Sequence, residues 1–163
     1  MGVDWESLLA PLLPGRVTLV AMGDRSAGDD AAALMLVDLL AGKASLPLLD
    51  CGSYPQNFLS IIARTCPHVV MLVDAAELGL LPGQVRVLDH AALADWGGSH
   101  GYPMGLLMEQ IEALSRARVF LLGIQIGDLT RGQSCHPAVE ETIRGLAEFL
   151  MSRYPARTNE RTP

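Results

Sequence analysis

Residues 17–30 read VTLVAMGDRSAGDD, and this stretch indicates the class of fold. The mostly apolar run from Arg16 to Met22 is typical of a strand that is buried on both faces of a sheet. The stretch from Asp30 to Leu40 then favours a helix, with Asp29 as a candidate N-cap and Gly42 beyond its end. A buried strand that leads through a glycine-containing loop into a helix favours an open, doubly wound α/β fold.

The same alternation of apolar runs and helical stretches continues to the end of the chain. Strands are expected at 46–49, 68–74, 84–88 and 119–124, and helices at 55–65, 103–116 and 137–153. The connection from Ala75 to Gly83 is short for a helical crossover, so the strand at 84–88 is expected to be antiparallel. The sequence therefore predicts a three-layer α/β/α sandwich around a mostly parallel five-stranded sheet.

The chain has 163 residues, which is enough for one domain with a full core. We expect this domain to cover residues 1–153 and residues 154–163 to form a frayed tail. Half of the residues are hydrophobic (50%), so the body of the chain has the composition of a folded protein. A net charge of -6 would repel a phosphate backbone, which argues against nucleic acid as a partner.

Residues 1–15 contain Asp4 and Glu6 where a secretory leader would carry positive charge, and no apolar run reaches membrane-spanning length. The three cysteines have neither the spacing of a disulfide framework nor that of a zinc finger: Cys51, Cys66 and Cys135. We therefore expect buried thiols in a reducing compartment, and a soluble cytoplasmic protein without membrane insertion.

Three candidate site residues come from distant parts of the sequence that the predicted topology brings together. Asp30 follows the first strand. Asp74 ends the apolar run at residues 69–73. If the strand at 119–124 is parallel to the first, the helix before it starts at the carboxyl edge of the sheet, and His100 joins the two acids there. Ligands of open α/β sheets bind at this edge. Two carboxylates and an imidazole suit a divalent metal.

Each of these residues also has an interpretation without a functional role. An acid pair at a helix start, such as Asp29 and Asp30, commonly does no more than cap the helix. Asp74 on its own fits an Asx-turn at a strand end. His100, which lies among glycines, on its own fits a solvated loop. It is the convergence of the three residues on one edge that favours a site.

The loop at 23–30 has the wrong charge for a phosphate-binding loop. It lacks the Lys-Ser/Thr ending of a P-loop and the Gly-x-Gly-x-x-Gly pattern of dinucleotide folds, and its carboxylates would repel phosphate unless a cation intervened. Asp50 ends the second strand at the same edge and is a further candidate for contact with a ligand. A nucleophile pair of Cys51 and His100 has no local signature, so a buried structural cysteine is favoured.

Several short runs of the sequence occur in an order and at a spacing that characterise one protein family. These runs are Val17–Asp24, Gly28–Asp30, Asp50–Ser53, Val73–Ala75, Ser99–His100 with Pro103 and Leu106, and Leu122–Gln125. Together they resemble the nickel-iron hydrogenase maturation endopeptidases over most of the chain, which implies a phosphorylase/hydrolase-like fold. The Gly-Ile-Gln run and the pattern from Asp50 to Asn57 look closest to the branch that serves formate-hydrogenlyase-type hydrogenases.

The resemblance implies a peptidase that removes a C-terminal extension from the hydrogenase large-subunit precursor after nickel insertion. The family's metal-contacting residues map onto Asp30, Asp74 and His100, which are then also the candidate catalytic residues. The precursor carries the nickel, and the resting site of the peptidase is expected to be empty. In chemical terms, the metal or a water that it activates would act on the scissile carbonyl while a carboxylate accepts a proton.

The chain departs from the family pattern at three positions, and two alternatives stay open. Asp24 stands where the family usually has Asn, and Ala31 and Ala33 replace common glycines. A non-cleaving metal or precursor chaperone would use the same three ligands. A receiver-like phosphoacceptor domain is less favoured because it needs a lysine at the end of the fifth strand, whereas the only lysine is Lys43.

Overall fold

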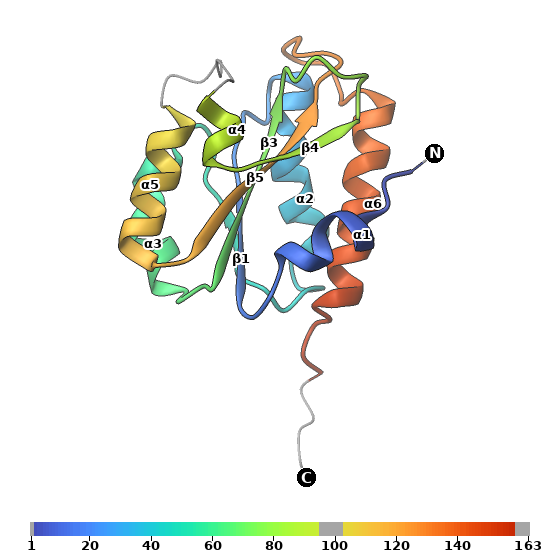
Figure 1. Cartoon of the computed structure of the whole chain (residues 1–163). Coiled ribbons are helices and arrows are strands. Elements are labelled where there is room, and N and C mark those ends of the chain that lie inside the picture. The colour runs from blue at the N-terminus through green and yellow to red at the C-terminus, as the bar shows by residue number, and fades with distance from the viewer. Residues whose placement is uncertain (1, 95–102, 159–163) are drawn as a thin grey trace.

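The computed structural model describes residues 2–94 and 103–158 as three layers, with one sheet between two layers of helices (Figure 1). The strands are β1 (Val17–Ala21), β2 (Leu48–Asp50), β3 (Val69–Ala76), β4 (Val85–Leu88) and β5 (Arg118–Gln125). The sheet order is β2-β1-β3-β5-β4. All neighbours are parallel except β4, which is antiparallel to β5. The predicted α/β/α sandwich, with its single antiparallel strand, is confirmed.

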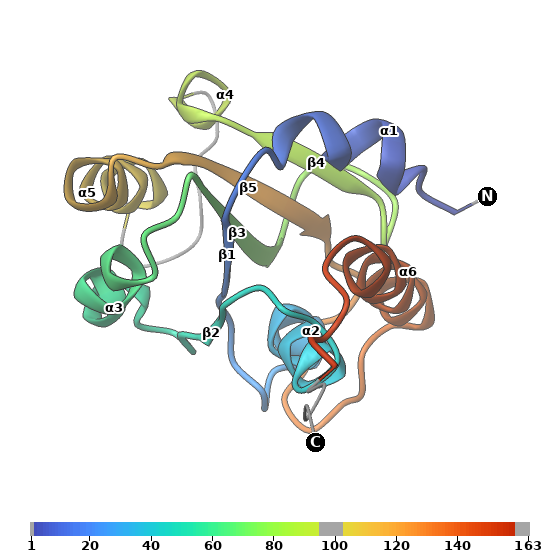
Figure 2. The ribbon, with the colours of Figure 1, turned by 90° about the horizontal axis from the view of Figure 1, so that it is seen from below.

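Helices cover both faces of this sheet, as seen from below in Figure 2. The α-helices are α1 (Trp5–Leu9), α2 (Ala32–Leu40), α3 (Leu59–Arg64), α4 (His90–Ala94), α5 (Met104–Ser115) and α6 (Pro137–Arg153). Three short 3-10 turns accompany them: η1 (Ala10–Leu12), η2 (Gly28–Ala31) and η3 (Pro55–Phe58). The helices α1, α2 and α6 pack on one face, while α3 and α5 pack on the other. No helix among the described residues is long and apolar enough to cross a membrane.

The central strand β3 supplies both hydrophobic cores, because its side chains alternate between the faces. Met71 and Val73 pack with α1, α2 and α6, whereas Val70 and Leu72 pack with α3 and α5. All eight residues of β3 are buried. Such a strand explains why the sequence shows a continuous apolar run here instead of an alternating pattern. Truncation of Leu72 to alanine would cost roughly 2–5 kcal/mol of stability.

Several predicted boundaries change in the structure. The final helix is confirmed at Pro137–Arg153, but β3 continues to Ala76, so Asp74 lies inside the strand and does not end it. The predicted helix at 30–40 begins only at Ala32, after the turn η2. Beyond the last helix, Tyr154 accepts a hydrogen bond from the backbone N–H of Ser45 (2.9 Å). The domain limit at residue 153 stays a prediction.

Candidate active site

The carboxyl edge of the sheet brings together the acids that end or follow its strands. In the register of the sheet, Ala21 at the end of β1 faces Asp50 of β2 on one side and Val73 of β3 on the other. Asp74 is the next residue of β3, and its side chain is buried, with 1% of the residue exposed. By the alternation of the strand, Asp74 lies on the face that α3 and α5 cover.

Asp30 reaches the same edge through a close backbone contact with Gly23. The Asp30 carbonyl accepts a hydrogen bond from the N–H of Asp24 (3.2 Å), and the Gly23 N–H donates to the Gly52 carbonyl after β2 (2.9 Å). Gly23 has a φ of 148°, and a Cβ at this position would lie 1.8 Å from the Asp30 oxygen. Only glycine fits here, so Gly23 fixes the position of Asp30, which is half-buried in η2. The turn η2 itself packs against β3, the strand that carries Asp74.

His100 lies outside the described residues, so its approach to Asp30 and Asp74 stays a prediction. The helix that follows it is nevertheless placed as expected. The helix α5 ends at Ser115, and β5 starts at Arg118 opposite Val69, at the amino edge of the sheet. Since α5 runs back to that edge from Met104, it begins at the carboxyl edge.

The structure corrects the predicted role of Asp29, which is not a helix N-cap. The N-cap of α2 is Ala31, and no side chain caps this helix. The buried carboxylate of Asp29 instead accepts three backbone hydrogen bonds, from Gly127 (2.6 Å), Asp128 (2.7 Å) and His136 (2.6 Å). Asp29 therefore ties the loop between β5 and α6 to η2, directly beside Asp30.

A second charged network fixes the loop between β1 and η2. The Arg25 guanidinium contacts both Asp38 of α2 (2.7 Å) and Asp50 (2.6 Å). Hydrogen bonds from this guanidinium lower the pKa of Asp38, and the two carboxylates raise the pKa of Arg25. Asp50, which the sequence indicated as a possible ligand contact, is thus engaged by a neighbouring cation.

Asp24, in the loop after β1, holds the turn of its own loop. Its Oδ1 accepts hydrogen bonds from the Ser26 N–H (2.8 Å) and hydroxyl (2.7 Å), and its Oδ2 lies 3.3 Å from Arg131. The Ser26 hydrogen bonds lower the pKa of Asp24, with Arg131 contributing. The charge of Asp24 is therefore balanced in part by a cation from the loop that Asp29 anchors.

The loop from 77 to 84, which follows β3, is held by the buried side chain of Gln125 at the end of β5. Its Oε1 accepts hydrogen bonds from the N–H groups of Leu78 (2.7 Å) and Leu80 (3.1 Å), and its Nε2 donates to Glu77 (3.1 Å). A receiver domain would need a lysine at this position. The only lysine, Lys43, follows α2 near the opposite edge of the sheet, so the receiver hypothesis is wrong.

The cysteines are free thiols with different degrees of exposure. Burial, with the Asp50 charge as a smaller cause, raises the pKa of Cys51 to about 12. A thiol that stays protonated is a poor nucleophile, which supports the structural role predicted for Cys51. Cys135 is half-buried and Cys66 is exposed, so the expectation of buried thiols is confirmed for Cys51 alone.

No group of three His, Cys, Asp or Glu side chains that would hold a metal occurs among the described residues. Of the predicted set, the structure brings Asp30 and Asp74 to one edge, and His100 is the member that it does not describe. Sequence reasoning missed Arg25 and Gln125 as groups that organise this edge. Their signals were weak, since an arginine in a glycine-containing loop and a glutamine at a strand end are both common.

Comparisons with known proteins identify the family. A family model, described as hydrogenase maturation protease (HycI), matches residues 35–153. The chain is 32% identical over 111 residues to the hydrogenase 3 maturation protease of Escherichia coli, covering 66% of this chain and 70% of that protein. It is 22% identical over 121 residues to a putative hydrogenase maturation protease of Methanocaldococcus jannaschii, covering 68% and 72%.

Solved structures of hydrogenase maturation proteases have the same fold as this chain. The crystal structure of the NiFe hydrogenase maturation protease HycI from Thermococcus kodakarensis matches with a TM-score of 0.80 at 25% identity, over 89% of this chain and 97% of that one. A crystal structure of a hydrogenase 3 maturation protease matches with a TM-score of 0.75 at 26% identity, over 84% and 90%. The fold is therefore that of solved hydrogenase maturation proteases, which are endopeptidases. The chain belongs to the hydrogenase maturation protease family, as the resemblance in its sequence implied.

Proposed function

We propose that this protease removes the C-terminal extension from the large-subunit precursor of a nickel-iron hydrogenase, and that it recognises nickel already inserted in the precursor. The observation that carries the proposal is the arrangement of Asp30 and Asp74, a half-buried and a buried acid at one edge of the sheet. With His100 from the segment before α5, they offer two oxygen ligands and one nitrogen ligand. This donor set suits a divalent first-row metal.

The nickel belongs to the substrate in this proposal, and the protease carries no metal of its own in the resting state. A metal bound by the precursor would lie in contact with the carboxylates only when the precursor docks. Recognition of nickel would then precede cleavage, because the donor set of Asp30, Asp74 and His100 meets its metal only when a nickel-loaded precursor has docked.

The chemical step follows from the same residues. The nickel of the substrate acts as the Lewis acid that polarises the scissile carbonyl or a water. Asp30, which is more exposed than Asp74, is the better placed carboxylate to accept a proton from the attacking water. Asp74, buried in β3, is better suited to hold a fixed position against the metal.

The client is proposed from the relatives. The Escherichia coli relative is named for hydrogenase 3, and the Gly-Ile-Gln run ends at Gln125, which holds the loop after β3. We therefore propose a hydrogenase of the formate-hydrogenlyase type as the client. The free thiols of the described chain support a reducing compartment, the cytoplasm, as the place of action.

The test uses the purified protein with the large-subunit precursor from the same genome, in nickel-loaded and nickel-free forms. Mass spectrometry of the precursor C-terminus is the readout. Nickel-dependent loss of a C-terminal peptide is the expected result. Stable binding without loss of mass would contradict the cleavage step, and equal cleavage of both forms would contradict recognition of nickel.

A further inference from the structure

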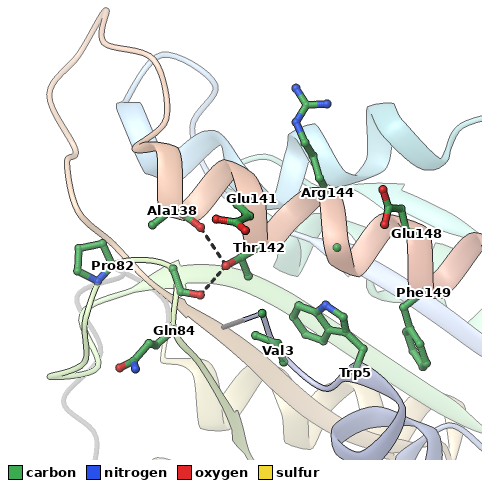
Figure 3. A pocket seen from close by; sticks show the side chains of 13 residues that line it. Val3, Trp5, Pro82, Gln84, Ala138, Glu141, Thr142, Arg144, Glu148 and Phe149 are labelled. Carbon is green, nitrogen blue, oxygen red and sulfur yellow. Dashed lines mark hydrogen bonds between the residues drawn. The ribbon is translucent and has the colours of Figure 1, made fainter.

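A groove of about 680 Å³ lies along α6, outside the candidate site (Figure 3). The N-terminal segment forms one wall with Val3 and Trp5, and the turn before β4 forms another with Pro82 and Gln84. One side of α6 completes the groove. None of these residues takes part in the arrangement of acids at the carboxyl edge, so the groove lies outside the candidate active site.

The walls of the groove are fixed by the turn before β4. The Thr142 hydroxyl of α6 donates a hydrogen bond to the Gly83 carbonyl (2.6 Å). A Cβ on Gly83 would lie 2.4 Å from the carbonyl oxygen of Ala138, so only glycine allows this approach. The groove is therefore formed before a ligand binds, which lowers the entropic cost of binding.

The floor of the groove presents an unused hydrogen-bond donor. Trp5 is only 8% exposed, and its indole N–H makes no hydrogen bond within the part of the chain that the structure describes. In Figure 3 the nitrogen edge of the ring faces α6, where Gly145 lies; a Cβ at that position would be 3.0 Å from Nε1. Trp5 Nε1 is not one of the buried side-chain atoms without a partner in the described part of the chain, so this donor is reached from the groove. An acceptor of a bound polypeptide can therefore take its hydrogen bond.

The rim of the groove on α6 is acidic. Glu141 and Glu148 are seven residues apart, which places them two turns apart on one side of the helix. The cation between them, Arg144, also lines the groove, but its guanidinium is bound to Glu140 at 2.6 Å. Neither Glu141 nor Glu148 forms an ion pair within the described residues. The two carboxylates are therefore free to attract a cation.

We propose that this groove is a docking site for a basic segment of the precursor polypeptide, away from the bond that is cut. A lysine or arginine side chain would lie between Glu141 and Glu148, and a backbone carbonyl would accept the Trp5 N–H. Phe149 offers apolar contact beside them. The groove lies on the face of the sheet that α6 covers, whereas Asp74 lies on the face that α3 and α5 cover, so the docked segment is remote from the bond that is cut. This inference rests on the proposed function.

The test compares Glu141→Gln, Glu148→Gln and the double variant with Glu109→Gln, which removes an equally exposed charge from α5. Cleavage of the nickel-loaded precursor is measured at low and high salt. Each single variant should raise KM about threefold and the double variant about tenfold, with kcat unchanged and a smaller salt dependence. Glu109→Gln should match the wild type. Gly145→Ala, which helix propensity favours, should also raise KM because its methyl group would cover the indole N–H.

Wild-type KM and salt dependence in the double variant would overturn the docking site while leaving the proposed function intact. If the wild type cuts no precursor, the proposed function fails. The docking site is then tested by measuring the affinity of the nickel-loaded precursor for each variant. Weaker binding to the double variant than to Glu109→Gln would still support docking. Equal binding, or no binding to the wild type, would overturn it.

Discussion

Asp29 accepts a 2.6 Å hydrogen bond from the backbone N–H of His136, which is 107 residues further along the chain. This bond, with those from Gly127 and Asp128, joins the loop before α6 to the turn that carries Asp30. The two neighbouring acids thus have different tasks. Asp29 is buried and structural, whereas Asp30 is half-buried at the candidate site.

Replacement of Asp29 tests this division of tasks. Asp29→Ala would leave three backbone N–H groups without their acceptor, and we expect a loss of at least about 3 kcal/mol in the free energy of unfolding. Asp29→Asn keeps one oxygen and should lose less. Urea unfolding measures both, and an unchanged midpoint for Asp29→Ala would show that the loop is held by other contacts.

Gly23→Ala should disable the site through the backbone. The new Cβ would collide with the Asp30 carbonyl, since the ideal position lies 1.8 Å from that oxygen. We expect Asp30 to shift and cleavage to fall at least about 100-fold. Gly105→Ala in α5 is the matched control, because no atom of the described residues lies within 4 Å of its added methyl group. The control should gain about 0.5–1 kcal/mol of stability, and full activity of Gly23→Ala would contradict the geometry.

Gln125→Ala should loosen the loop at 77–84. The substitution removes the acceptor of the Leu78 and Leu80 N–H groups, and we expect a cost of about 1–3 kcal/mol together with a higher KM for the precursor. Gln133→Ala, at an exposed position in another loop, is the control. Hydrogen exchange at Leu78 and Leu80 reports the loop directly. Unchanged protection of these two amides in Gln125→Ala would contradict the assignment.

Thiol alkylation tests the raised pKa values. A thiol reacts as its thiolate, so a folded-state pKa of about 12 for Cys51 and about 11 for Cys135 means that both stay protonated, and slow to react, at pH 8 to 10. Exposed Cys66 should react first at pH 8. Peptide mapping after iodoacetamide treatment gives the order. Rapid alkylation of Cys51 in the folded protein would contradict its burial.

Much of the fold was predictable because β3 and α6 carry strong local signals. The continuous apolar run before Asp74 predicts a central buried strand, and Pro137 marks the first residue of α6. The short helices α1 and α4 were not predicted, since each has only five residues and depends on tertiary packing.

The candidate site was predictable only in part. Topology alone predicts that Asp30 and Asp74 share the carboxyl edge, because parallel strands all end there. The role of Asp29 was not predictable, since an acid before a helix normally caps it and the partners of Asp29 lie about a hundred residues away. The same holds for Arg25, whose partner Asp38 lies on the next helix. The family model begins at residue 35, so it covers the positions of Asp74 and His100 but not that of Asp30.

The most direct test of the central claim is the single-turnover rate of cleavage of the nickel-loaded precursor by Asp30→Ala, Asp74→Asn and His100→Ala. Circular dichroism and urea unfolding should first establish that each variant is folded, with Glu109→Gln as a control on an exposed surface of α5. We predict that each of the three variants loses cleavage by at least about 100-fold while Glu109→Gln keeps the wild-type rate. A folded Asp30→Ala or His100→Ala variant that cleaves at the wild-type rate would contradict the assignment of the metal-contacting residues.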